Sequence, residues 1–139
     1  MNWLGWALLS AAFAGLTAML AKLGVREVDS DLATAIRTSV ILVLAWSIAA
    51  LRSAQSVAEV PAATWLWLVL SGLATGASWL CYFRALQLGD VSRVAPIDKL
   101  SVVLVAVFAF LFLGERPSGQ NWLGIGLIAA GAVLIAVKR

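Results

Sequence analysis

Apolar residues run through this chain in five long segments separated by short polar connections. The segments cover about residues 3–21, 32–51, 64–86, 96–113 and 121–137. Each is close to the ~20 residues that a helix needs to cross the hydrocarbon core of a bilayer, and none alternates like a barrel strand. The pattern therefore predicts an all-α fold, an integral membrane bundle of five transmembrane helices.

The connections carry residues that are typical of helix ends. Asp29-Ser30-Asp31 precedes the second segment, Pro61 precedes the third, and Gly114 with Pro117-Ser118-Gly119 separates the fourth from the fifth. We expect Glu115 and Arg116 to cap this last turn. With no soluble appendage between the segments, the chain is expected to form a single five-helix domain over residues 1–139.

The first segment is expected to be a retained helix rather than a cleaved signal. No positive charge precedes it, its apolar run is longer than the usual core of a signal peptide, and Lys22 closes its far end.

Composition agrees with a membrane protein and removes several classes of function. Hydrophobic residues make up 63% of the chain and charged residues 12%, with a mean hydropathy of +0.98. There is no histidine, and Cys81 is the single cysteine. Disulfide frameworks, zinc sites and Cys/His nucleophilic pairs therefore lack their parts, we expect no bound metal, and no enzyme activity is expected. Because no basic face is present, we expect no nucleic-acid partner.

A short glycine motif, GxGxxA at residues 124–129, matches the dinucleotide fingerprint. That fingerprint binds a cofactor only where a strand turns into a helix. Inside a membrane helix we interpret it as a chance match, and no cofactor is expected.

Positive charges and tryptophans predict the orientation in the membrane. With the N-terminus outside, the inner side receives most of the basic residues: Lys22, Arg26, Arg93, Lys138 and Arg139, with Arg37, Arg84 and Lys99 near helix ends. The outer side keeps Arg52 and Arg116. Basic residues favour the cytoplasmic side and tryptophans the interfaces. The tryptophans placed toward the outer face are Trp3, Trp6, Trp46, Trp65, Trp67 and Trp122. We expect a multi-pass membrane protein with its N-terminus outside and its C-terminus in the cytoplasm.

Small residues on two segments indicate close helix packing. The candidate packing positions are Gly72 and Gly76 on the third segment, and Gly124, Gly126 and Gly131 on the fifth. Small side chains let helix backbones approach where lipid supplies no hydrophobic driving force. The contact can lie within the domain or at a subunit interface.

Charged residues at the entrances of apolar segments allow two interpretations. In the structural one, Pro96 and Asp98 occupy the first turn of the fourth helix, where aspartate faces the positive end of the dipole, and Lys99 extends to the lipid headgroups. In the functional one, Arg37 and Arg84, each flanked by apolar residues, line a vestibule that attracts an anionic group. Asp98 then acts as counter-ion to Lys99 or as a protonatable coupling group. The candidate contacts for substrate or coupling are Arg37, Arg84, Asp98, Lys99, Tyr82 and Trp79.

Several motifs in the C-terminal half resemble the EamA-type repeat of the drug/metabolite transporter superfamily. The matching stretches are Tyr82-Phe83-Arg84-Ala85-Leu86-Gln87-Leu88-Gly89, Leu113-Gly114-Glu115-Arg116, Asn121-Trp122-Leu123-Gly124 and residues 127–134. Arg37 is similar to the arginine that often opens the second helix in that family. Relatives often carry a proline in the middle of the fourth helix, near the position of Val102, whereas Pro96 lies earlier. The resemblance therefore does not predict a kinked fourth helix for this chain.

The resemblance implies a carrier in the cell inner membrane that moves a small metabolite, with export the expected direction. Most relatives join two inverted five-helix repeats around a central cavity, whereas this sequence resembles the single-repeat bacterial and archaeal form. It implies a partner, either a second five-helix copy or an inverted paralogue, and a substrate with anionic or zwitterionic groups. Inverted repeats need opposite insertion, while the charge bias favours one orientation, so parallel and inverted assemblies both stay open. The alternative function is a non-transporting membrane subunit that assists a lipid-carrier enzyme or flippase.

Overall fold

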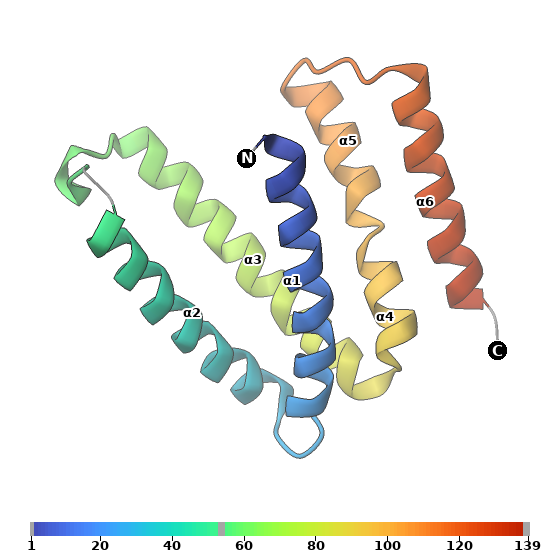
Figure 1. Cartoon of the computed structure of the whole chain (residues 1–139), viewed down its shortest axis with the longest axis horizontal. Coiled ribbons are helices and arrows are strands. Elements are labelled where there is room, and N and C mark those ends of the chain that lie inside the picture. Colours follow the sequence, from blue (N-terminus) through green and yellow to red (C-terminus); the bar gives the residue numbers. More distant parts are fainter. Residues whose placement is uncertain (1, 53–54, 138–139) are drawn as a thin grey trace. The chain divides into compact units, whose positions relative to one another are not determined.

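A computed structural model describes residues 2–52 and 55–137. Figure 1 shows the helices in chain order, with α1 at Trp3–Gly24, α2 at Ser30–Arg52, the short 3₁₀ helix η1 at Val57–Glu59, α3 at Ala62–Leu88, α4 at Val91–Asp98, α5 at Ser101–Phe112 and α6 at Gly119–Val137. No strand occurs in these described residues. Five segments are long and apolar enough to cross a membrane, with α4 and α5 together forming one of them. The all-α membrane prediction is confirmed.

Helix ends extend beyond the apolar runs because the backbone stays helical where the side chains become polar. Asp29 accepts a hydrogen bond from the Asp31 backbone N–H at 2.9 Å, which satisfies one free donor at the start of α2. The Asn2 side chain accepts from the Gly5 N–H at 3.0 Å and caps α1 in the same way. Hydropathy marks the membrane core of each helix, and in α1 and α2 a side-chain cap marks where the helix starts.

The fourth span differs from the sequence prediction. It begins at Val91, not at Pro96. Asp90 has an extended backbone, and its carbonyl oxygen accepts hydrogen bonds from the N–H groups of Arg93 and Val94 at 3.0 and 2.9 Å. Pro96 therefore lies inside α4, and Asp98 is its last residue. The prediction that both occupy a first turn, with Asp98 at the positive end of the dipole, is wrong.

The same span is interrupted between its two helices. The N–H of Lys99 donates to the carbonyl of Pro96 at 3.1 Å, and that of Leu100 donates to Ile97 at 2.9 Å. These bonds span three residues instead of four, so the chain is wound more tightly here than in an α-helix. The family resemblance alone gave no reason to expect a kinked fourth helix. The structure nevertheless breaks the fourth span between Asp98, the end of α4, and Ser101, the start of α5.

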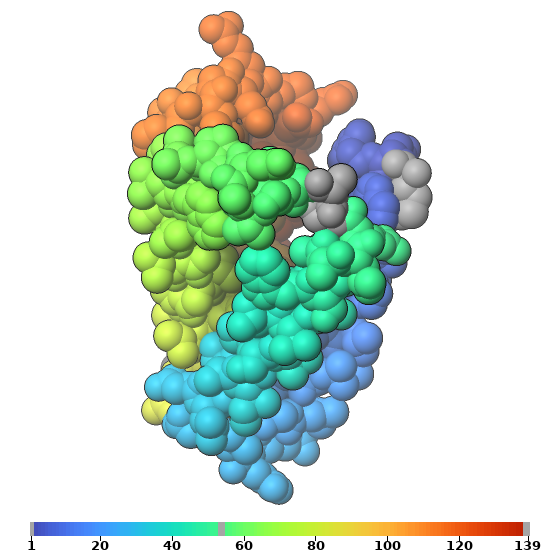
Figure 2. Space-filling view, turned by 90° about the vertical axis from the view of Figure 1, so that its left-hand side faces the viewer, coloured from blue at the N-terminus to red at the C-terminus, as the bar shows by residue number. Residues whose placement is uncertain are grey.

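The described chain divides into two compact units, residues 1–88 and 89–139. In the first unit, α1 and α2 each pack against α3, and the space-filling view shows α2 in front with α3 on one side and α1 on the other (Figure 2). Its buried residues gather where the end of α1, the start of α2 and the end of α3 meet: Ala18, Ala21, Val25, Ser30, Thr34, Phe83 and Leu86. The three helices are thus joined most tightly at one end.

The second unit is a helical hairpin in which α4 and α5 both pack against α6. Ala109 of α5 and Ala132 of α6 are its buried residues. Arg93 fixes the polar end of the hairpin by donating a hydrogen bond from Nη2 to the Ala136 carbonyl at 3.0 Å. Basic side chains near a helix C-terminus satisfy carbonyls that the helix itself leaves free.

Large apolar side chains are exposed along every span, as with Trp3 at 80% and Phe112 at 79%. In a bilayer these surfaces contact acyl chains or other apolar helices. The candidate packing glycines Gly72, Gly76, Gly124, Gly126 and Gly131 meet nothing in their own unit within 4 Å of a Cβ placed on them. Their role in packing stays a prediction that concerns surfaces beyond the unit.

Candidate functional site

Polar side chains stabilise the part of the first unit where the end of α1, the start of α2 and the end of α3 meet, which we call the joined end. Lys22 of α1 donates from Nζ to the carbonyl of Leu86 at 2.6 Å. Gln87 of α3 donates from Nε2 to the carbonyls of Val28 at 2.8 Å and Val25 at 3.4 Å. Helix C-termini and loops leave carbonyls that need donors when water is scarce. The connection between α1 and α2 is therefore held against the end of α3.

Arg84 belongs to this polar cluster. Its Nη1 donates to Oε1 of Gln87 at 3.1 Å, and its side chain is otherwise exposed. The family motif Arg84-Ala85-Leu86-Gln87 thus places a structural glutamine one turn after the arginine. A role for Arg84 as a substrate contact stays a prediction.

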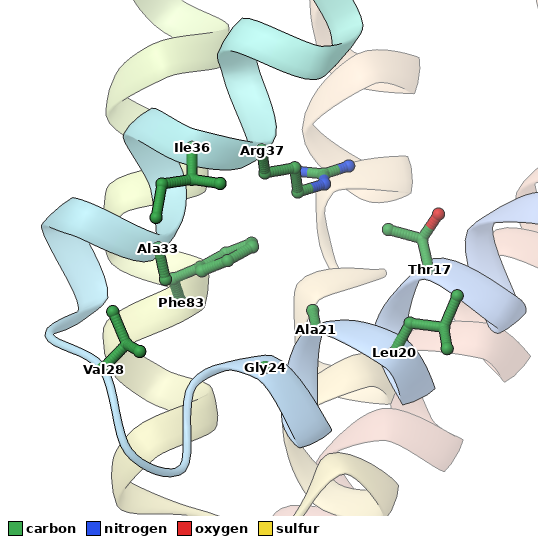
Figure 3. A pocket seen from close by; sticks show the side chains of 9 residues that line it. All are labelled: Thr17, Leu20, Ala21, Gly24, Val28, Ala33, Ile36, Arg37 and Phe83. Carbon is green, nitrogen blue, oxygen red and sulfur yellow. The ribbon is translucent and has the colours of Figure 1, made fainter.

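Beyond the joined end, α1, α2 and the connection between them line a partly open cavity, and α3 supplies one wall. Its volume is about 360 Å³, near the lower limit for ligand pockets. The lining residues are Thr17, Leu20, Ala21, Gly24, Val28, Ala33, Ile36, Arg37 and Phe83. Figure 3 shows these side chains around the space between the two helices. We call this space the Arg37 cavity.

Small residues keep the Arg37 cavity open. Ala21 and Gly24 lie on the α1 side and Ala33 on the α2 side, where larger side chains would fill the space. Both helices are held against α3, and α3 contributes only Phe83 to the lining. The cavity is therefore a gap between two helices that rest on a common third helix.

Arg37 is the charged residue of the lining, and aromatic rings hold its position. Its guanidinium carbon lies 4.0 Å from the centroid of the Trp79 ring and 5.5 Å from that of Phe83. Trp79 and Phe83 are four residues apart on α3, so they lie on one helix face. Among the candidate residues, the structure brings together Arg37 and Trp79. A role for Tyr82, which lies on the same helix as Trp79, stays a prediction.

The other two candidates lie in the second unit. Lys99 and Asp98 form an ion pair with 3.2 Å between Nζ and Oδ2, at the interruption between α4 and α5. Asp98 also lines a separate hollow with Ser101 of α5 and Ala129 of α6. Asp98 is thus the counter-ion of Lys99 in this structure. The predicted ring of Arg37, Arg84, Asp98 and Lys99 is not assembled within either unit and stays a prediction.

Three residues of the site were missed in the sequence. Phe83 carries a recognisable signal, because aromatic residues four apart on one helix offer a continuous face to a cation. Thr17 is an isolated polar residue in an apolar helix, and Figure 3 shows its side chain across the cavity from Arg37. Gln87 has no local signal, since its acceptors Val25 and Val28 are distant in the sequence.

Comparison with known proteins relates the whole chain to membrane transporters. It is 63% identical over 137 residues to a protein of Sinorhizobium sp described as an uncharacterized transporter in the cobO 3'region, covering 98% of this chain and 97% of that protein. It is 39% identical over 69 residues to a probable 4-amino-4-deoxy-L-arabinose-phosphoundecaprenol flippase subunit, ArnE, of Aeromonas hydrophila, covering 50% of this chain and 60% of ArnE. No solved structure matches the chain. The EamA-like transporter family matches residues 1–137, and the chain therefore belongs to that family.

Proposed function

We propose that this chain is one repeat of a secondary transporter that exports a small metabolite across the cell inner membrane, and that it carries out no reaction. The family and the five apolar spans support a membrane transporter. The observation that carries the proposal is Arg37, whose cation lies in an otherwise apolar cavity between two spans. Ionisable groups at membrane depth usually mark substrate or ion pathways.

The proposed orientation has the N-terminus outside and the C-terminus in the cytoplasm. Lys22 and Arg26 lie at the joined end of the first unit, in and beside the connection between α1 and α2. Arg93 lies in the first turn of α4, which follows the end of α3 directly. Basic residues at these positions favour a cytoplasmic location for that end. The two further basic residues that support this orientation, Lys138 and Arg139, lie outside the described residues.

The proposed assembly contains two repeats. Repeat-built transporters place the substrate at the interface of their halves, and this chain supplies one repeat. The open glycine surfaces of α3 and α6 allow close approach by a partner helix. The partner is a second copy or a related repeat inserted in the opposite direction, and Asp98 is the proposed coupling group of each half.

Transport is tested with inverted membrane vesicles from cells that produce the protein. The vesicles are energised, incubated with an extract of small metabolites, washed and analysed by mass spectrometry. We expect at least one anionic or zwitterionic metabolite to accumulate with the wild type and not with Arg37→Gln. Arg52→Gln changes an arginine on the same helix outside the cavity lining and should behave as the wild type. If wild-type and protein-free vesicles accumulate the same metabolites, the transport proposal is wrong.

The ArnE-like relatives favour a second candidate function. These relatives are probable flippase subunits, and in this second function the chain assists a lipid-carrier enzyme or flippase without transporting a metabolite. Under this alternative, the tagged protein co-purifies with one membrane enzyme or flippase partner, and the vesicles show no metabolite uptake.

A further inference from the structure

The polar residues of the Arg37 cavity share one level in the membrane. Arg37 lies seven residues after the start of α2, and Thr17 lies seven residues before the end of α1. At 1.5 Å per residue, both are about 10 Å from the joined end of the unit. Half of the hydrocarbon core is about 15 Å thick, and the helix ends extend past the apolar runs, so this level lies between the joined end and the centre of the bilayer.

The guanidinium of Arg37 extends from α2 into the cavity and does not turn back toward the joined end (Figure 3). An arginine that extends to the headgroups would turn back toward the joined end. Instead its guanidinium carbon is closer to Trp79 than to Phe83, at 4.0 Å against 5.5 Å. Trp79 lies nine residues before the end of α3, about 13 Å from it at 1.5 Å per residue, and is therefore the deeper of the two rings. Contact with lipid headgroups does not explain this position.

The cation has aromatic partners but no anion. Within residues 2–52 and 55–137, Arg37 forms no ion pair with a carboxylate, whereas Lys99 pairs with Asp98. A ring face stabilises a guanidinium less than a bidentate carboxylate or phosphate does. An anionic group that entered the cavity would therefore gain the strongest contact available there, with the Thr17 hydroxyl on the opposite wall as a further donor.

The remaining walls determine what is attached to that anionic group. Seven of the nine lining residues are apolar: Leu20, Ala21, Gly24, Val28, Ala33, Ile36 and Phe83. A highly hydrated metabolite would lose its water against these walls without replacing its hydrogen bonds. A hydrocarbon chain would be favoured by the same walls. At about 360 Å³ the space accommodates a head group and the first part of a chain, not a whole lipid.

We infer that the Arg37 cavity binds an amphiphile, with an anionic phosphate or carboxylate head at Arg37 and Thr17 and a hydrocarbon chain along the apolar walls. This inference rests on the proposed function and names the substrate class of the same site. The amphiphile enters from the bilayer between α1 and α2, and the chain beyond its first carbons stays in lipid.

Binding is tested with the full chain in nanodiscs of phosphatidylcholine. The probes are dodecyl phosphate, dodecanol, which has the chain without the charge, and inorganic phosphate, which has the charge without the chain. The readout is the probe concentration that gives half of the maximal rise in unfolding temperature. We expect a rise with dodecyl phosphate alone, a loss of affinity of about tenfold or more in Arg37→Gln, and a smaller loss in Arg37→Lys, which keeps the charge but not the planar fork.

Two further variants separate binding from folding. Ala33→Leu fills the cavity and retains Arg37, so it should weaken binding of dodecyl phosphate without removing the cation. Arg52→Gln should bind as the wild type. The inference is overturned if Arg37→Gln and Ala33→Leu both bind like the wild type, or if dodecanol or inorganic phosphate produces the same rise as dodecyl phosphate.

The vesicle experiment tests transport and the nanodisc experiment tests binding of an amphiphile, so either proposal can be contradicted without the other. Arg37-dependent uptake of a metabolite without binding of dodecyl phosphate would contradict the inference that the cavity binds an amphiphile and leave the transport proposal intact. Arg37-dependent binding of dodecyl phosphate with no metabolite uptake would overturn the export of a small metabolite and retain the site.

Discussion

The guanidinium of Arg37 on α2 lies over the ring of Trp79 on α3, 4.0 Å from its centroid. This contact joins two helices, and within the described residues of the unit no carboxylate pairs with the cation. It also directs the charge toward the space lined by α1, which supplies Thr17 to the same cavity. The same pair of side chains therefore links the packing of two helices to the proposed binding site.

Replacing Trp79 should weaken this contact between α2 and α3. Trp79→Leu removes the ring face and is expected to lower the free energy of unfolding in detergent by about 1 kcal/mol. Trp79→Phe retains a smaller aromatic face and should lower it less. Trp67→Leu is the matched control, because Trp67 is 69% exposed at the other end of the same helix. Equal stability of Trp79→Leu and Trp67→Leu would show that the ring does not hold Arg37.

Gln87 should be the most important polar residue of the joined end. Gln87→Leu leaves the carbonyls of Val25 and Val28 and the Arg84 guanidinium without this partner. Unsatisfied groups of this kind cost about 1–3 kcal/mol each when buried, so we expect a fall in unfolding free energy within that range. The control is Gln120→Leu in the exposed first turn of α6. A fall of the same size in both variants would contradict the assigned role.

Gly114 should not tolerate a side chain. Its φ of 68° lies in the left-handed region, where the N–H of Glu115 returns to the Ala109 carbonyl at 3.1 Å and ends α5. Gly114→Ala is expected to destabilise the protein by about 1–2 kcal/mol because of the Cβ clash in this conformation. The comparison is Gly15→Ala, mid-helix with open space around it, which should be neutral or stabilising. Thermal unfolding in one detergent measures both.

Cysteine labelling in cells should determine the orientation. In a Cys81→Ala background, Ser118→Cys lies in the connection before α6, and Glu27→Cys lies in the connection between α1 and α2. We expect an impermeant maleimide to label Ser118→Cys and not Glu27→Cys, because the basic residues favour a cytoplasmic α1–α2 connection. Labelling of both positions would indicate dual topology and an inverted homodimer. Labelling of Glu27→Cys alone would reverse the proposed orientation.

The glycine surface of α3 should matter for assembly and not for the fold of the chain. No atom of the first unit lies within 4 Å of a Cβ placed on Gly76, so Gly76→Leu is expected to leave the unfolding temperature of the single chain unchanged. It should reduce chemical cross-linking between copies, because close helix approach needs a small residue. Ala74→Leu changes another face of the same helix and should leave cross-linking intact. Unchanged cross-linking in Gly76→Leu would exclude this surface as the contact.

Much of the architecture was predictable because hydropathy acts locally. A run of apolar residues about as long as the bilayer is thick can be satisfied only by a helix that bonds its own backbone. Helix ends were less predictable, as the fourth span shows. Ser92 and Arg93 are polar and charged and, with Val91, read as a connection, yet they form the first turn of α4, whose first N–H groups bond to the Asp90 carbonyl.

What the amino-acid sequence determined by itself was the five spans, the absence of histidine and the presence of an arginine among apolar residues on the second span. Only the tertiary structure decided which side chains that arginine meets. Trp79, Phe83 and Thr17 come from two other helices, and their distance from Arg37 depends on how three helices join at Lys22, Leu86 and Gln87. Periodicity specifies a residue's place on its own helix, whereas a cavity requires the relative positions of several helices, which long-range packing and hydrogen bonds establish.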